Sequence, residues 1–498
     1  MAIAHERYLR YYLQFVQQHK DDDSAIESEY AQLQRVGEIL STSLTLDDPT
    51  MREQWILDYI NALDHFLERR GLWSENVRWA ERGLAAAQAL GREVLVGRFL
   101  HDIGWCYRHL GQPQTALKYL TQALTVRQQA GPRAGEATTL NNIGIVHDDL
   151  GQRSRALEFL QQALAIRQEV GDKTGEAITR HNLAATYFSL GRWAEAETEY
   201  KAALILSQSV GDLVSEAGTL NNLGELAVAQ GKVTEAAPYY QAALEKFMAL
   251  GDRMHQATVL NNLGLLMSQR GQVEQAVQQF ETALTLIRQS GGLVTEAVIL
   301  NNLGTVYEWL GQFQRALAYF EQALSMHRAV GDDAGAGTAL GNLGGVYYRM
   351  EEWSRAIEIF EEALALLQPG GDRARIATLL NNLAAAHYAL GQVDVALSYV
   401  EQAVDTHREL GDREGEATVL NNLAALAYAA NDLEKARDCL LQSLAISEDI
   451  QDVRSCITNL NNLAVVYRAM DDAEFATACH KRAQVLRQRL DVPEEPVL

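Results

Sequence analysis

The sequence contains little of what marks several classes of protein. Its four cysteines show no C-x-x-C spacing, so they indicate neither a zinc site nor a disulfide framework. Only seven prolines occur in 498 residues, and strand-like alternation is missing, which predicts helices throughout. No apolar run approaches the ~18 residues of a membrane span, and residues 1–20 lack the layout of a signal peptide. These absences favour a cytoplasmic protein. The cysteines are Cys106, Cys439, Cys456 and Cys479.

Basic residues are also in short supply. The chain has 43 Lys and Arg against 65 Asp and Glu, a formal net charge of −22. Such a chain repels phosphate backbones and anionic lipid, so neither nucleic acid nor a membrane is an expected partner. Catalytic signatures are missing too, since there is no H-E-x-x-H, no G-x-S-x-G and no phosphate-binding glycine loop. We expect no enzyme activity, no cofactor and no metal.

What the sequence has is a repeat with a period of 40 residues. The phrase Leu-Asn-Asn recurs, and weaker copies begin at Leu100, Arg180 and Leu340. The period predicts eleven units over residues 51–490. A divergent helical cap over residues 1–50, with helices at 4–19 and 23–42, and a disordered acidic tail at 491–498 complete the predicted organisation. The clear copies of the phrase begin at Leu140, Leu220, Leu260, Leu300, Leu380, Leu420 and Leu460.

Each unit is predicted to contain two helices separated by glycine turns. Gly191 and Gly211 illustrate the pattern, because glycine adopts the left-handed conformation that closes a helix. An aspartate follows the second turn in most units, where its carboxylate can cap the next helix. The predicted caps are Asp172, Asp212, Asp252, Asp332, Asp372, Asp412 and Asp452.

Side chains of similar size recur at equivalent positions in the two helices of each unit. The first helix carries Leu300, Leu303, Gly304 and Tyr307, and the second carries Ala316 and aromatic Phe320. This order resembles the tetratricopeptide repeat, and the 40-residue length is similar to kinesin light chain and the Pins-type scaffolds. The resemblance implies an all-α fold, a right-handed superhelix or α-solenoid of about eleven helix pairs.

A row of asparagines is the strongest functional signal. In a tetratricopeptide superhelix the first helix of each unit lines the concave wall, and helical geometry puts Asn142 and its equivalents on that side. Asparagine inside a helix costs about 0.5 kcal/mol relative to alanine, so nine copies suggest a compensating role. We expect them to bind a peptide, as the resemblance implies; the alternative is a ladder of asparagines bonded to one another. The nine are Asn142, Asn182, Asn222, Asn262, Asn302, Asn342, Asn382, Asn422 and Asn462.

The groove is predicted to differ between the two halves of the chain. Small residues such as Gly345, Ala385 and Ala425 give the C-terminal half a roomy channel edged by tyrosines, while the N-terminal half is more polar. We therefore expect the main anchor of a partner over residues 341–470, although the tyrosines could equally pack between repeats. The predicted tyrosines are Tyr348, Tyr388 and Tyr428.

The favoured function is a scaffold or adaptor whose groove binds a protein or peptide. The alternative is a ligand sensor, because residues 5–33 resemble the segment that joins bacterial STAND-type ATPases to their tetratricopeptide sensors. Helices rich in Gln and Ala suggest a bacterial source.

Overall fold

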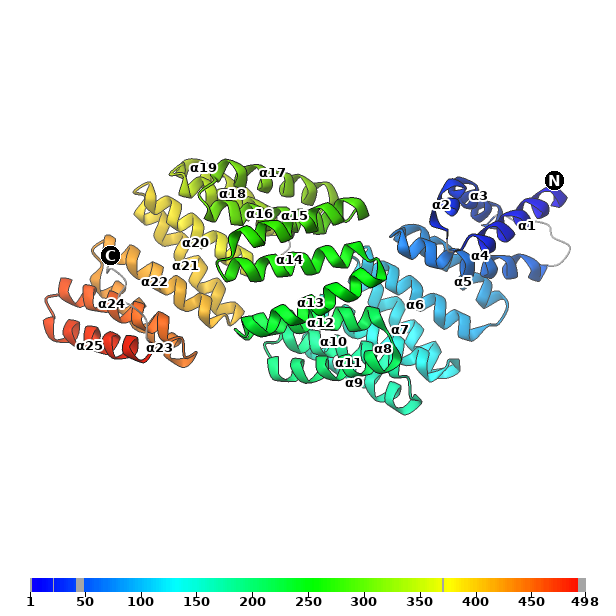
Figure 1. The fold of residues 1–498 in the computed structure, drawn as a ribbon, viewed down its shortest axis with the longest axis horizontal. Helices are drawn as coiled ribbons and strands as arrows, with labels where there is room; N and C mark the ends of the chain where they lie inside the picture. Colours follow the sequence, from blue (N-terminus) through cyan, green and yellow to red (C-terminus); the bar gives the residue numbers. More distant parts are fainter. Residues whose placement is uncertain (1, 21, 42–48, 370, 491–498) are drawn as a thin grey trace. The chain divides into compact units, whose positions relative to one another are not determined.

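The structure, a computed structural model, describes all residues except 1, 21, 42–48, 370 and 491–498 (Figure 1). The described residues form α-helices and no strand, as predicted. The predicted tail at 491–498 lies outside the described residues. The helices are α1 (Ala2–Gln18), α2 (Asp23–Ser28), α3 (Tyr30–Ser41), α4 (Pro49–Arg69), α5 (Trp73–Ala89), α6 (Glu93–His109), α7 (Pro113–Ala130), α8 (Arg133–Asp149), α9 (Arg153–Val170), α10 (Lys173–Ser189), α11 (Trp193–Val210), α12 (Leu213–Ala229), α13 (Val233–Leu250), α14 (Arg253–Gln269), α15 (Val273–Ser290), α16 (Leu293–Trp309), α17 (Phe313–Val330), α18 (Asp333–Arg349), α19 (Trp353–Leu367), α20 (Arg373–Ala389), α21 (Val393–Leu410), α22 (Arg413–Ala429), α23 (Leu433–Asp449), α24 (Val453–Ala469) and α25 (Ala473–Leu490).

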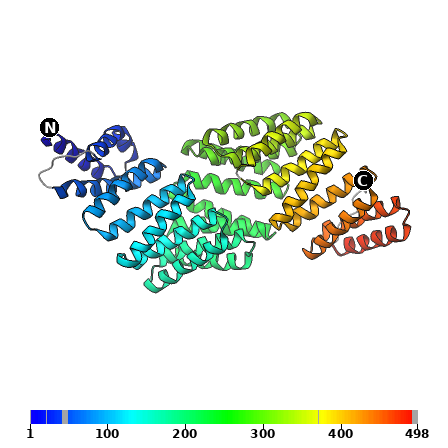
Figure 2. The same ribbon diagram turned by 180° about the vertical axis from the view of Figure 1, so that it is seen from behind.

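The chain divides into two compact units, Met1–Gly251 and Asp252–Leu498. Unit 1 contains α1 to α13 and unit 2 contains α14 to α25. From α4 onward the helices pair, an even-numbered A helix packing on the odd-numbered B helix that follows it. Figure 2 shows these pairs from behind. The sequence period thus corresponds to one A–B pair.

Small residues let the two helices of a pair approach closely. A Cβ atom added at Gly304 of α16 would lie 2.5 Å from the Phe320 ring of α17, and one at Gly344 would meet Phe360 in the same way. Both rings are almost completely buried. The predicted small residue and aromatic knob are therefore two halves of one packing contact.

The turns are built as the sequence indicates. Gly211 has φ of 72°, the left-handed conformation, and Asp212 then accepts a hydrogen bond from the backbone N–H of Ser215 at 3.1 Å. All seven predicted aspartate caps are confirmed in this way. In unit 2 some turns carry other residues in the left-handed conformation, among them Glu351 and Asp471, with φ of 62° and 60°.

The N-terminal region differs in one respect from the prediction. Instead of one helix over 23–42, α2 ends at Ser28 and α3 begins at Tyr30. Glu29, between them, has φ of −107° and ψ of 9°, outside the helical range. Its carboxylate accepts a hydrogen bond from the Tyr12 hydroxyl of α1 at 3.0 Å. This contact with a neighbouring helix accompanies the break. Helix propensities describe single residues, so they do not predict such a contact.

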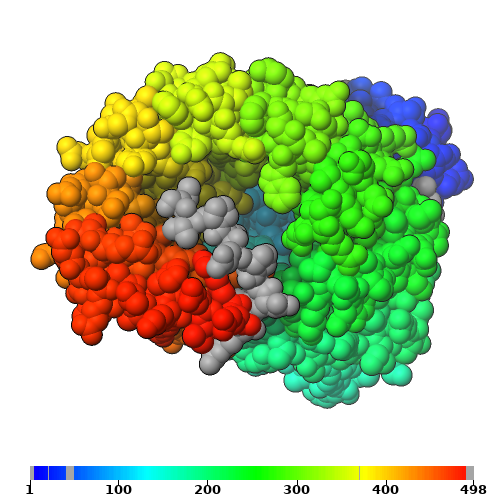
Figure 3. Space-filling view, turned by 60° about the vertical axis from the view of Figure 1, so that its left-hand side comes forward, coloured from blue at the N-terminus to red at the C-terminus, as the bar shows by residue number. Residues whose placement is uncertain are grey.

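The A helices form the inner side of the stack in unit 2. Successive A helices approach one another directly, as α16 does α18 and α18 does α20. No comparably close approach joins successive B helices among the described residues. Figure 3 shows the repeats of unit 2, from light green through yellow to red, following a curve with a hollow on its inner side.

Candidate functional site

The predicted asparagines form a hydrogen-bonded ladder across the repeats. Nδ2 of Asn302 on α16 donates to Oδ1 of Asn261 on α14 at 2.7 Å. The same bond, to a residue 41 positions earlier, recurs from pair to pair. The other rungs run from Asn142 to His101 (2.9 Å), Asn182 to Asn141 (3.0 Å), Asn222 to His181 (3.2 Å), Asn422 to Asn381 (2.9 Å) and Asn462 to Asn421 (3.1 Å).

Each rung combines two adjacent positions of the A helix. The predicted asparagine is the donor, and the acceptor is the residue just before its equivalent in the preceding repeat. Acceptors such as Asn141 and Asn261 are buried, with 3% and 7% of their surface exposed. The ladder that the sequence left as an alternative is therefore present. It uses one amide hydrogen of each donor.

Hydrogen-bonding capacity nevertheless remains on the inner side. Among the described residues, Oδ1 of Asn302, Asn422 and Asn462 accepts no hydrogen bond, and each has a second amide hydrogen. Oδ1 of Asn142, by contrast, is occupied, because it accepts from Asn141 at 3.1 Å. Oδ1 of Asn222 is occupied in the same way, because it accepts from Asn221 at 3.2 Å. The ladder therefore leaves an acceptor free at Asn302, Asn422 and Asn462.

The ladder is interrupted in the middle of unit 2. Asn342 on α18 and Asn382 on α20 make no side-chain hydrogen bond within the described part of the chain. The acceptor expected for Asn382, 41 positions earlier, is Gly341, which has no side chain. Oδ1 of Asn301, the acceptor expected for Asn342, is buried and accepts no hydrogen bond among the described residues. Two consecutive rungs are therefore missing.

Histidine replaces the acceptor asparagine in two repeats of unit 1. His181 Nδ1 lies 3.0 Å from the Thr219 hydroxyl, and its Nε2 lies 3.2 Å from Nδ2 of Asn222. An amide N–H₂ facing Nε2 requires a neutral ring with the hydrogen on Nδ1. Burial lowers the pKa of His181 to about 4, which keeps the ring neutral at ordinary pH.

Two of the three predicted tyrosines line a cavity in the C-terminal half of unit 2. The cavity has a volume of about 200 Å³ and brings Tyr348 of α18 and Tyr388 of α20 together with Asn422 of α22. Ala385 and Ala425, the small residues of the predicted channel, complete its wall. The tyrosine rings are 37% and 45% exposed, so they are not consumed by packing between repeats. Tyr428 is similarly exposed but lies outside this cavity.

The N-terminal half is polar, and several of its polar groups are paired. Arg108 Nε donates to Asp149 at 2.6 Å, and the His109 ring stacks on Trp73 with centroids 3.9 Å apart. Burial is the main reason that the pKa of His109 is lowered. These contacts join neighbouring repeats and occupy the groups that make them.

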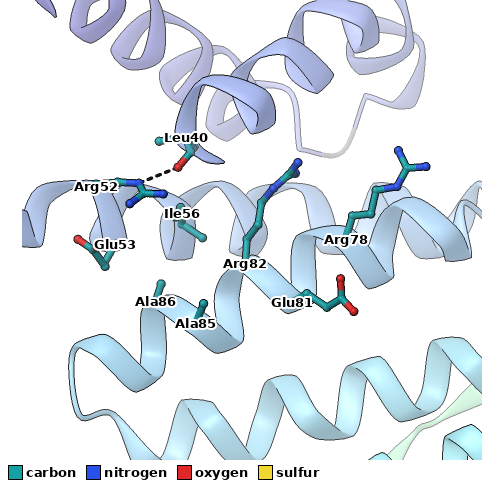
Figure 4. Close-up of a pocket in the computed structure, with 9 residues that line it drawn as sticks. All are labelled: Leu40, Arg52, Glu53, Ile56, Arg78, Glu81, Arg82, Ala85 and Ala86. Carbon is teal, nitrogen blue, oxygen red and sulfur yellow. Dashed lines mark hydrogen bonds between the residues drawn. The ribbon is translucent and has the colours of Figure 1, made fainter. Parts of the chain in front are cut away.

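A further cavity, of about 440 Å³, lies between the N-terminal helices and the first pair (Figure 4). Arg52, Arg78 and Arg82 line it together with Glu53 and Glu81. Charges of both signs are mixed there, and Nε of Arg52 donates to the Leu40 carbonyl at 2.7 Å. Sequence analysis did not predict this cavity, because the cavity combines the divergent cap with the least typical repeat.

Other classes of site have no support in the part of the chain that the structure describes. It holds no group of three or more His, Cys, Asp or Glu side chains that could bind a metal ion. Within the same residues, no helix has the length and apolar character needed to cross a bilayer.

The fold and the ladder define a helical-repeat protein whose A helices line an inner face. A family model described as "Tetratricopeptide repeat" matches more than half of the chain. The chain therefore belongs to the tetratricopeptide repeat family, and the resemblance seen in the sequence is confirmed. The matched segments are 95–169, 135–209, 175–245, 215–289, 295–368 and 375–449.

The likeness to one solved structure supports the fold, and two others are similar over shorter stretches. The quorum sensor NprR from B. thuringiensis is 16% identical, with a TM-score of 0.50 over 73% of this chain and 98% of that one. BtubC from P. vanneervenii is 24% identical, with a TM-score of 0.41 over 46% of this chain and 94% of that one. A putative kinesin light chain from Podosopora anserina is 20% identical, with a TM-score of 0.35 over 39% and 96%. No curated protein matches the chain.

Proposed function

We propose that this protein is a scaffold or adaptor that binds a protein segment along the inner face of unit 2. The supporting observation is the cavity of about 200 Å³ in which Tyr348, Tyr388 and Asn422 meet. Half-exposed tyrosines beside small residues accept an apolar side chain, and the nearby carboxamide oxygen can accept a backbone N–H. The rung from Asn422 to Asn381 joins α22 to α20, so it holds Asn422 beside the helix of Tyr388 before a partner binds.

A protein segment suits this surface better than a small molecule. The two cavities of the described residues that the predicted asparagines line in unit 2 measure about 200 and 170 Å³, below the ~300–1,000 Å³ typical of small-molecule sites. An extended or helical segment can instead occupy several shallow cavities along a row of repeats. The likeness to NprR, named a quorum sensor, concerns the fold alone. A sensor related to STAND-type ATPases stays the alternative prediction.

The test is a selection of random 12-residue peptides, displayed on phage, against the immobilised full chain. Enriched peptides are then titrated by fluorescence polarisation against wild type and the Tyr348→Ala/Tyr388→Ala double variant. We expect the double variant to bind more than tenfold more weakly, because exposed aromatic anchors dominate such interfaces.

Ile205→Ala is the matched control, since Ile205 is 66% exposed on B helix α11 of unit 1 and does not line the cavity of Tyr348 and Tyr388. It should leave binding unchanged. Equal affinity of all three proteins for every enriched peptide, or no enrichment at all, would count against the proposed function.

A further inference from the structure

The acceptor side chain of the ladder is absent in one repeat, at Gly341. Across the ten equivalent positions from residue 101 to residue 461, the acceptor is asparagine in seven and histidine in two. Gly341 is the single position without an acceptor side chain. The donor that would use it, Asn382, is retained although it has no partner among the described residues.

A cavity occupies the place of the missing side chain. It has a volume of about 170 Å³ and is lined by Gly341, Asn342 and Asn382, with Leu367 and Leu379 as its apolar wall. A Cβ atom added at Gly341 would meet only Leu379 Cδ2, at 3.5 Å. One water molecule takes up about 30 Å³ in the liquid, so the cavity has room for a whole side-chain head group.

The chemistry of the lining requires a ligand group that both accepts and donates. Nδ2 of Asn382 needs an acceptor, as in every complete rung. The hydroxyls of Thr338 and Thr378, also in the lining, already donate to backbone carbonyls at 3.0 and 3.2 Å, which leaves their oxygens as acceptors. A carboxylate has no hydrogen to offer these oxygens, whereas a carboxamide has two.

The charges around the cavity also favour an uncharged ligand group over a carboxylate. Among the described residues that line it, Arg375 alone is charged, and its guanidinium is already paired with Asp372. The pair is neutral overall, and the chain carries a net charge of −22, which disfavours an additional carboxylate. An uncharged head group with an aliphatic stem matches both the paired arginine and the two leucines.

We propose that the cavity at Gly341 binds the side chain of an asparagine or glutamine from the partner, whose carboxamide completes the ladder. The proposal rests on the proposed function, because it presupposes a peptide on the inner face of unit 2. It adds a sequence preference, because one position of the bound segment is required to be Asn or Gln.

The test repeats the peptide selection on three full-length proteins: wild type, Gly341→Asn and Gly218→Asn. In Gly341→Asn the new carboxamide belongs to the protein itself and fills the cavity. Gly218→Asn is the matched control, because Gly218 lies within A helix α12 of unit 1 and an added Cβ would meet nothing within 4 Å. Circular dichroism verifies that each variant keeps the helical content of wild type.

We expect wild type and Gly218→Asn to enrich peptides with Asn or Gln at one fixed position. Gly341→Asn should enrich the same motif without that preference. For one enriched peptide, changing this residue to Ala should weaken binding to wild type about tenfold, the loss of one net hydrogen bond of ~1.4 kcal/mol. The same change should leave binding to Gly341→Asn unaltered, and Asn382→Ala provides a second reading of the same contact.

Three results would overturn the inference. Identical motifs from wild type and Gly341→Asn would refute it while leaving the proposed function intact. A preference for Asp or Glu at the fixed position would show that the cavity takes a carboxylate. Failure to enrich peptides on any of the three proteins would refute the proposed function itself, and this inference with it.

Discussion

The neutral histidine in the ladder makes the stability of unit 1 depend on pH in a defined direction. Folding lowers the pKa of His181 from 6.5 to about 4. Between these values the unfolded chain binds a proton that the folded chain does not, so stability falls as the pH is lowered from 6.5 towards 4. The loss is complete near pH 4 and absent above pH 7.

The size of the effect follows from the shift. At 1.36 kcal/mol per pKa unit, the upper bound is about 3 kcal/mol. The polar contacts of the ring are neutral, namely Thr219 and Asn222, and it lies edge-on to Tyr200. The His181 residue as a whole is partly accessible to solvent, which screens the charge of a protonated ring, so we expect about 1–2 kcal/mol.

The perturbation that isolates this effect is His181→Asn. Asparagine accepts the same rung in other repeats, as Asn141 does from Asn182, so the variant keeps the ladder and loses only the titration. Thermal unfolding of both proteins is measured from pH 4 to pH 8. All other titrating groups are shared, and the difference curve reports His181 alone.

We expect the variant to gain about 2–4 °C per kcal/mol relative to wild type as the pH falls from 7 to 4.5. A difference that does not change with pH would refute the assignment of a neutral, buried ring. A difference that grows towards high pH would refute its sign.

Five further substitutions test the turns, the ladder and the helix packing by urea denaturation. Glu351→Gly should stabilise the fold by about 0.5–1 kcal/mol, because Glu351 holds a φ of 62° that favours glycine; a destabilised variant would contradict this. Asn422→Ala should destabilise by about 0.5–1 kcal/mol through loss of its rung, whereas Asn382→Ala, which loses none, should be neutral or slightly stabilising. Equal effects of the two would argue against the ladder. Gly304→Ala should cost about 1–3 kcal/mol against the Phe320 ring, while Gly345→Ala, with open space around it, should gain up to about 1 kcal/mol.

The repeat architecture was predictable because it depends on local chemistry that recurs. Gly211 and Asp212 show why: a left-handed turn and a cap are each decided by one residue and its immediate neighbours. The break at Glu29 was not predictable, since its carboxylate bonds to Tyr12 on another helix.

The candidate site was predictable in position but not in detail. Helical periodicity placed Asn302 on the inner side, yet whether its amide bonds to Asn261 depends on the distance between two A helices. That distance depends on packing across the whole helix pair, and the repeat pattern of the sequence does not reveal it. The consequence of Gly341 became visible only once the rungs were known, because a missing partner can be recognised only against the bonds that its neighbours make.

The register of the ladder also bears on how the chain folds. Every rung joins residues 41 positions apart, so none can form inside a lone helix pair, and each appears only when two adjacent pairs have docked. The stability of a repeat protein is approximately the sum of the intrinsic stability of each repeat and the interaction energy between neighbouring repeats. The amides of the ladder contribute to the interaction energy alone. They make unfolding more cooperative within a run of intact rungs. We expect this cooperativity to be weakest in unit 2 where the rungs of Asn342 and Asn382 are missing.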